Sequence, residues 1–152
     1  MAKFHYPFQK ILDLKENEKE FAQIQMAEAI KKQEASLRKN QEIYQKIIEV
    51  ENEKNQKQQA GVNIFELRML ENYMTQLKDQ LISAEHELEQ METHVTKTQN
   101  HLRAKVQEEK TWMNLKNQKL RQFELKEKSS EQTLLDEIAA NQFYRAFSLE
   151  RG

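Results

Sequence analysis

The residues of this chain best suited to chemistry are its histidines, which could hold a metal ion or move protons. Three of the four lie in the second half of the sequence, at His86, His94 and His101, and none has a histidine four residues away, as a helical zinc site requires. The chain has no cysteine, which excludes thiolate metal sites and a disulfide framework. We therefore predict no metal ion and no other cofactor.

Nucleotide chemistry and serine-based catalysis are also disfavoured. Gly61 is the only glycine in the interior of the sequence, so a glycine-rich phosphate loop cannot form. The serines are scattered along segments that cannot build a concave, water-excluding pocket. The net charge of −1 is far from the positive balance with which proteins neutralise a nucleic-acid backbone. The sequence predicts a protein that is not an enzyme and does not bind nucleic acid.

The composition predicts an all-α fold. Charged residues make up 32% of the chain and hydrophobic residues 38%, with one proline and two glycines, so turns are scarce. Pro7 suits the first turn of a helix, and Gly61 suits the end of one. We expect a single domain over residues 1–152, with a helix over about 7–58, a turn over about 59–63 and a helix over about 64–147. This is a long two-helix antiparallel coiled-coil hairpin with unequal arms.

The second predicted helix carries the clearest periodicity. Apolar or small residues alternate at spacings of three and four without a break, which is the heptad pattern of a coiled-coil seam. Beyond the last of them the apolar positions shift in phase, so the seam should loosen there. The residues of the predicted seam are Leu67, Leu70, Met74, Leu77, Leu81, Ala84, Leu88, Met91, Val95, Thr98 and Leu102.

The first predicted helix has a weaker and half-polar stripe. Its predicted seam is Phe8, Ile11, Leu14, Phe21, Met26, Ile30, Gln33, Leu37, Asn40, Tyr44 and Ile47. Gln33 and Asn40 would fix the register rather than add stability. The aromatic N-terminal stretch could be a membrane-surface anchor, but its basic flank is thin for that use. Packing of Phe4, Phe8 and Ile11 against Trp112 and Leu120 is the preferred interpretation.

Both helices start from a turn near residue 60 and rise by 1.5 Å per residue, so the longer helix should extend past the end of the shorter one by roughly 30 residues. This end carries an apolar face that a lone helix would leave in water, so a partner is expected to cover it. The face consists of Leu134, Leu135, Ile138, Ala139, Phe143, Tyr144 and Phe147.

Charge and tyrosine patterns leave two interpretations open. Residues 85–92 carry four glutamates and no cation, while residues 97–128 carry nine lysines and arginines against four glutamates. Both blocks could be solvated faces of a coiled coil, or the basic block could meet an acidic partner. Tyr44 and Tyr73 could be seam residues or an exposed contact site near the turn.

No stretch approaches the roughly 18 consecutive apolar residues that cross a membrane, and the N-terminus lacks the features of a secretory signal. We therefore expect a cytoplasmic protein without direct membrane insertion.

Two stretches of the sequence resemble the FliJ family of the flagellar type III export apparatus. They are Phe-Gln-Lys-Ile-Leu-Asp-Leu-Lys-Glu at residues 8–16 and, after Gly61, Phe-Glu-Leu-Arg-Met-Leu-Glu-Asn-Tyr at residues 65–73 with Leu77. The resemblance in length and hairpin layout covers the whole chain. It implies an antiparallel coiled coil like the central stalk of rotary ATP synthases, which would couple the export ATPase to the export gate.

The resemblance also implies partners and contact residues. The end with both termini would enter a hexameric export ATPase (FliI-like), and the hairpin would touch the cytoplasmic domain of the export-gate membrane protein (FlhA-like), which would hold the chain at the inner face of the cell membrane. Tyr44, Tyr73, Leu77 and Leu81 would contact the gate. Register counting adds Leu134, Ile138, Phe143 and Phe147 as ring contacts. The free protein should be a monomer that also escorts export chaperones; the alternative is a generic coiled-coil scaffold or adaptor.

Overall fold

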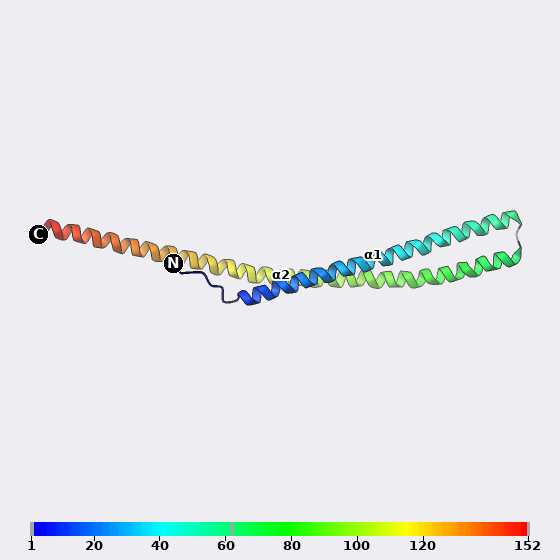
Figure 1. Cartoon of the computed structure of the whole chain (residues 1–152), viewed down its shortest axis with the longest axis horizontal. Coiled ribbons are helices and arrows are strands. Elements are labelled where there is room, and N and C mark those ends of the chain that lie inside the picture. Colours follow the sequence, from blue (N-terminus) through cyan, green and yellow to red (C-terminus); the bar gives the residue numbers. More distant parts are fainter. Residues whose placement is uncertain (1, 62, 152) are drawn as a thin grey trace. The chain divides into compact units, whose positions relative to one another are not determined.

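Two long helices make up the fold of this chain in a computed structural model that describes residues 2–61 and 63–151. Helix α1 spans Gln9–Ala60 and helix α2 spans Ile64–Arg151, with lengths of 52 and 88 residues (Figure 1). No strand occurs among the described residues. The predicted all-α hairpin with unequal arms is therefore confirmed. The first helix lies two residues further along the chain than predicted, and the second continues four residues past the predicted end.

The turn between the helices is built from local hydrogen bonds and one glycine. Gly61 adopts a φ of 73°, a left-handed conformation that side chains with a Cβ disfavour. Its N–H donates to the Gln58 carbonyl at 3.4 Å. Asn63 then caps α2, because its Oδ1 accepts a hydrogen bond from the Phe65 N–H at 3.2 Å. Gly61 therefore ends α1 as the sequence predicted, and the cap starts α2 within three residues.

Contacts divide the described chain into two compact units. The hairpin unit is Glu18–Lys105, and the terminal unit combines the segment up to Asn17 with the chain from Val106 onwards. Each unit contains parts of both helices. The prediction of one domain over the whole chain stays a prediction.

In the hairpin unit, the predicted seam of α2 is confirmed. Every residue of the seam from Leu67 to Leu102 is buried or half-buried, and Leu77, Ala84 and Thr98 are the most deeply covered. The positions between them are mostly exposed. The alternating spacing of three and four therefore marks the face of α2 that packs against α1.

The predicted seam of α1 was half wrong. Met26, Gln33, Asn40 and Ile47 are half-buried as expected, but Ile30, Leu37 and Tyr44 are exposed. The buried positions lie one residue earlier, and they hold smaller side chains on average: Ala22, Ala29, Ser36, Ile43 and Val50.

The sequence interpretation followed the largest apolar side chains, whereas the helix pair buries small ones along most of this stretch. Small side chains let two helices pack closely, and the bulkier neighbours then lie beside the seam rather than in it. Phe8, Leu14 and Phe21, also predicted to be seam residues, are exposed as well, and the buried residues near them are Leu12 and Ala22.

One buried hydroxyl in the seam predicts an unusual stabilising substitution. The Ser36 side chain is 6% exposed, and its Oγ has no hydrogen-bond partner in the part of the chain that the structure describes. An unsatisfied buried polar group costs about 1–3 kcal/mol, so Ser36→Ala should raise the free energy of unfolding by roughly 1 kcal/mol, as measured by chemical denaturation. Ser83→Ala, at an exposed position of α2, controls for the higher helix propensity of alanine. Equal effects of the two changes would contradict this account of Ser36.

In the terminal unit, aromatic side chains of the N-terminal segment pack on α2. Phe4 lies 5.6 Å from Phe123 and Phe8 lies 5.7 Å from Trp112, measured between ring centroids. The Tyr6 hydroxyl donates a hydrogen bond to the Trp112 carbonyl at 3.1 Å. The predicted contact of Phe8 with Trp112 is thus confirmed, whereas Phe4 contacts Phe123, a residue that the prediction did not include.

Tyr6 is the anchor of this segment. Its side chain is buried, and burial raises the pKa of its hydroxyl above the ordinary value, because the charged phenolate would lose its hydration. The hydroxyl therefore remains a hydrogen-bond donor at neutral pH. Its contribution to stability is fully present below the ordinary tyrosine pKa and is lost as the pH rises through the raised one.

Candidate partner-binding surfaces

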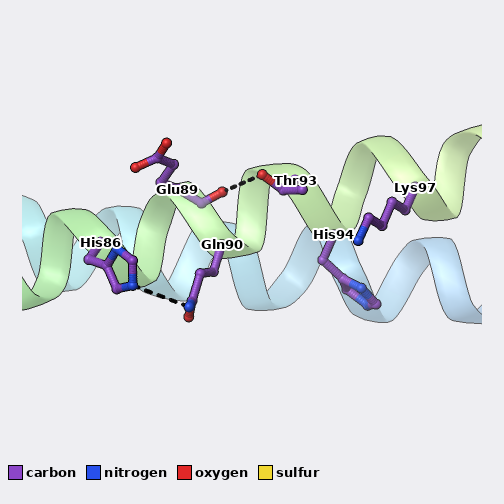
Figure 2. Close-up of a pocket in the computed structure, with 6 residues that line it drawn as sticks. All are labelled: His86, Glu89, Gln90, Thr93, His94 and Lys97. Carbon is purple, nitrogen blue, oxygen red and sulfur yellow. Dashed lines mark hydrogen bonds between the residues drawn. The ribbon is translucent and has the colours of Figure 1, made fainter.

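Two of the histidines of α2 line a surface depression of this helix. Figure 2 shows a shallow depression along α2 lined by His86, Glu89, Gln90, Thr93, His94 and Lys97. The His86 Nε2 lies 3.3 Å from the Gln90 Nε2, and His94 points away from His86. Among the described residues no group of three or more histidines and carboxylates could hold a metal ion. All six lining residues belong to α2, so the depression is a surface feature of this helix.

The residues predicted to contact the export gate have unequal access to a partner. Leu77 is only 2% exposed and lies in the seam, so its side chain packs inside the hairpin. Tyr73 and Tyr44 are 44% and 58% exposed, and Leu81 is half-buried. The two tyrosines therefore present most of the accessible surface of this set.

Tyr73 lies on one flank of the seam. A flank is one of the two sides of the seam. In an antiparallel coiled coil, a residue that directly precedes a seam position of one helix lies on the same flank as the residue that directly precedes the equivalent seam position of the other helix. The ion pair of Lys39 Nζ with Glu87 Oε2, at 3.2 Å, marks this flank in the hairpin unit. Tyr73 directly precedes the seam residue Met74, so it belongs to the flank of Lys39 and Glu87.

Tyr44 lies on the other flank. It follows the seam residue Ile43 and lines a surface depression of about 410 Å³ together with Leu81 and Glu85, the residue that follows Ala84 of the seam. Asn40, Gln41 and Gln45 complete the lining. The structure thus brings Tyr44 and Leu81 together but leaves Tyr73 across the seam from them.

The residues predicted to contact the ATPase ring lie in the terminal unit, on the last part of α2. Every residue from Lys128 to Glu150 is helical and exposed. The rings of Phe143 and Phe147 stack with centroids 6.5 Å apart. The exposed large apolar residues of this segment are Leu134, Leu135, Ile138, Phe143, Tyr144, Phe147 and Leu149. The predicted overhang of α2 is confirmed within the described residues.

A second group of exposed apolar residues was missed in the sequence interpretation. Ile64, Phe65 and Met69 form the start of α2 beside the turn, and all three are exposed. Phe65 and Met69 fall outside the heptad seam but are four residues apart, as are Met69 and Tyr73. That spacing on one side of a helix was the available signal.

Ion pairs account for part of the charge of the hairpin. Near the turn, Lys54 pairs with Glu71 and Lys57 with Glu53 and Glu66. Lys105 pairs with Glu18 at 3.1 Å in the hairpin unit. In the terminal unit, Lys15 pairs with Glu108 at the same distance. All of these pairs except Lys57 with Glu53 join α1 to α2, so several lysines and glutamates link the two helices.

No helix in the described part of the chain is long and apolar enough to span a membrane.

Comparison with known proteins gives consistent results. The sequence model of the family described as "Flagellar FliJ protein" matches residues 4–148. A relative of that name from Bacillus subtilis (strain 168) is 24% identical over 140 residues, covering 92% of this chain and 95% of the relative. No solved structure matches the chain. The family model matches nearly the whole chain, and the matched residues form a helical hairpin. The chain therefore belongs to the FliJ family and is a component of flagellar protein export.

Proposed function

We propose that this protein is a central-stalk-like coiled coil that couples the export ATPase ring to the export gate. In this proposal the hexameric, FliI-like ATPase binds the exposed end of α2. The cytoplasmic domain of the FlhA-like gate binds the hairpin unit near its turn. The gate contact would hold the protein at the inner face of the cell membrane without any spanning helix of its own.

The exposed end of α2 carries the proposal. A lone helix gains most of its stability from packing an apolar face, yet this segment has seven exposed large apolar side chains over residues 134–149. Clusters of exposed apolar side chains often mark a site of interaction with another protein. A partner that buries this segment would supply the missing packing.

The arrangement of these side chains favours a partner that surrounds the helix. These residues do not form the single face that the sequence analysis expected: at 100° per residue, Leu134 and Ile138 lie on one side of the helix, while Phe143 and Phe147 lie roughly opposite to them. A helix that is apolar on several sides is buried on several sides. One docked helix would cover a single stripe, whereas the central opening of a ring would contact the whole circumference.

The gate contact is supported by the two exposed tyrosines of the hairpin unit. Tyrosine is among the residues that most often dominate binding energy at protein interfaces. Because Tyr44 and Tyr73 lie on opposite flanks of the seam, a gate surface that uses both must reach around the hairpin. Leu77 supports this surface by holding α2 against α1.

Two tyrosine variants test both ends of the proposal with the same substitution. We expect Tyr73→Ala to weaken binding of the gate's cytoplasmic domain about tenfold and to leave ATPase binding unchanged. Tyr144→Ala should weaken ATPase binding about tenfold and leave binding of the gate's cytoplasmic domain unchanged. Binding is measured by titrating each purified partner against the full chain. If both variants hold both partners as tightly as the parent chain does, the proposed sites are wrong.

A further inference from the structure

A short N-terminal strap, residues 4–8, lies against α2 in the terminal unit and is held there by its side chains. Its rings pack on Trp112 and Phe123 of α2, and the Tyr6 hydroxyl donates a hydrogen bond to the Trp112 carbonyl. Among the described residues, no backbone–backbone hydrogen bond joins the strap to α2. The strap also lies outside both helices. A segment held in this way can open locally while the helices stay paired.

The strap covers part of an apolar stripe on α2. Trp112, Phe123 and Leu134 follow one another at intervals of eleven residues, and Ile138 lies one helical turn beyond Leu134. Eleven residues complete three helical turns with an excess of only about 20°, so these four side chains lie on one side of α2. Trp112 and Phe123 are half-buried where the strap packs on them, whereas Leu134 and Ile138 are 57% and 45% exposed. The strap therefore covers the first half of the stripe and leaves the second half open.

The contacts of the strap show what kind of surface the stripe accepts. Two rings of the strap lie 5.6 and 5.7 Å from the rings of Phe123 and Trp112, measured between centroids. The Tyr6 side chain between them is only 4% exposed. Aromatic side chains of this kind are common anchors at protein interfaces. The covered half of the stripe thus already binds an aromatic chain segment, which the same molecule supplies.

We propose that the strap is an intramolecular latch that competes with the export ATPase for the stripe from Trp112 to Ile138. This inference rests on the proposed function and adds a regulatory element to its ATPase contact. With the latch closed, the ATPase reaches only Leu134 and Ile138 of the stripe. With the latch open, Trp112 and Phe123 join the contact. The apparent affinity then depends on the fraction of chains whose latch is open.

The test changes the two sides of the latch contact separately and titrates the purified ATPase against each full chain. Tyr6→Ala/Phe8→Ala releases the strap and leaves the stripe intact, so we expect the ATPase to bind about fivefold tighter than to the parent. Trp112→Ala/Phe123→Ala also releases the strap but removes half of the stripe, so this variant should bind no more tightly than the parent. Leu14→Ala, at an exposed position of α1 in the terminal unit, is the control and should bind like the parent.

Fluorescence of Trp112, the only tryptophan of the chain, reports the state of the latch without any partner. Its emission should shift to longer wavelength in Tyr6→Ala/Phe8→Ala, because water then reaches the indole ring. Tyr6→Phe removes only the hydroxyl that bonds to the Trp112 carbonyl, and it should change emission and affinity in the same direction by less. Circular dichroism verifies that helicity is retained in every variant. An unshifted emission in Tyr6→Ala/Phe8→Ala would overturn the latch.

The binding outcomes separate this inference from the proposed function. If the parent binds the ATPase and Phe143→Ala/Phe147→Ala weakens that binding, the proposed contact stands. The latch alone is then overturned if Tyr6→Ala/Phe8→Ala binds no more tightly than the parent, or if Trp112→Ala/Phe123→Ala binds more tightly. If the parent chain does not bind the ATPase at all, both ideas fail together.

Discussion

Leu77→Ala is expected to lower the free energy of unfolding by about 2–5 kcal/mol, because truncating a buried leucine removes its transfer energy and leaves a cavity. Leu77 is one of the two largest side chains in the described structure that are almost fully buried. The Lys39–Glu87 and Lys54–Glu71 ion pairs set a register in which Leu77 lies opposite the part of α1 that holds Ile47 and Val50. Urea denaturation followed by far-ultraviolet circular dichroism measures the change.

Tyr73→Ala is the control for this effect. Tyr73 precedes the seam and is largely exposed, so its loss should cost less than about 1 kcal/mol, as surface substitutions usually do. The pair therefore separates stability from gate binding: Leu77→Ala unfolds the hairpin more easily, and Tyr73→Ala leaves it intact. Similar stability losses in both variants would contradict the assignment of Leu77 to the seam and of Tyr73 to the surface.

Under the proposed stalk function the full chain raises the turnover of the export ATPase, and removing the chain after Ser130 is expected to abolish that stimulation while leaving the hairpin folded. The deleted residues are all exposed where the structure describes their side chains, so they contribute little to packing within the chain. The loss of helical signal should match the number of deleted residues, and the urea midpoint should stay unchanged. ATPase turnover with the truncated chain should fall to that of the ATPase alone.

A point variant excludes a simple effect of length. Phe143→Ala/Phe147→Ala removes the stacked rings from the full chain and should also reduce stimulation. Leu125→Ala, at an exposed position before the deleted segment, should stimulate like the parent. Undiminished stimulation by the truncated chain would rule out the end of α2 as the ring contact.

The sequence predicted α2 well and α1 only in part, for a physical reason. The seam of α2 consists mainly of large apolar residues, so its heptad period can be recognised in the sequence between Leu67 and Leu102. The seam of α1 uses Ala22, Ala29 and Ser36, whose burial depends on how closely α2 approaches. That distance is a property of the pair and is absent from the sequence of either helix alone. Gly61 fixed the turn, because few other residues tolerate its conformation.

The prediction of the candidate sites depended on the exact position of the seam in α1. One residue is 100° of rotation on a helix, so moving the seam from Tyr44 to Ile43 turns Tyr44 out onto a flank. The prediction that grouped Tyr44 with Tyr73 had no means of assigning flanks, since these follow from the register of both helices. By contrast, the overhang of α2 required only the position of the turn and the lengths of the helices, and it was predicted correctly.

The central claim is that α1 and α2 of one chain pair with each other and leave their outer faces for partners. A zero-length carbodiimide joins an amine directly to a carboxylate in contact with it, and Lys39 Nζ lies 3.2 Å from Glu87 Oε2. The measurement is crosslinking of an equal mixture of unlabelled and ¹⁵N-labelled chains, followed by mass spectrometry of the Lys39–Glu87 crosslinked peptide. The account predicts crosslinks only between peptides of the same isotope. Crosslinks that join a labelled peptide to an unlabelled one would show that each helix pairs with a second copy, and would contradict it.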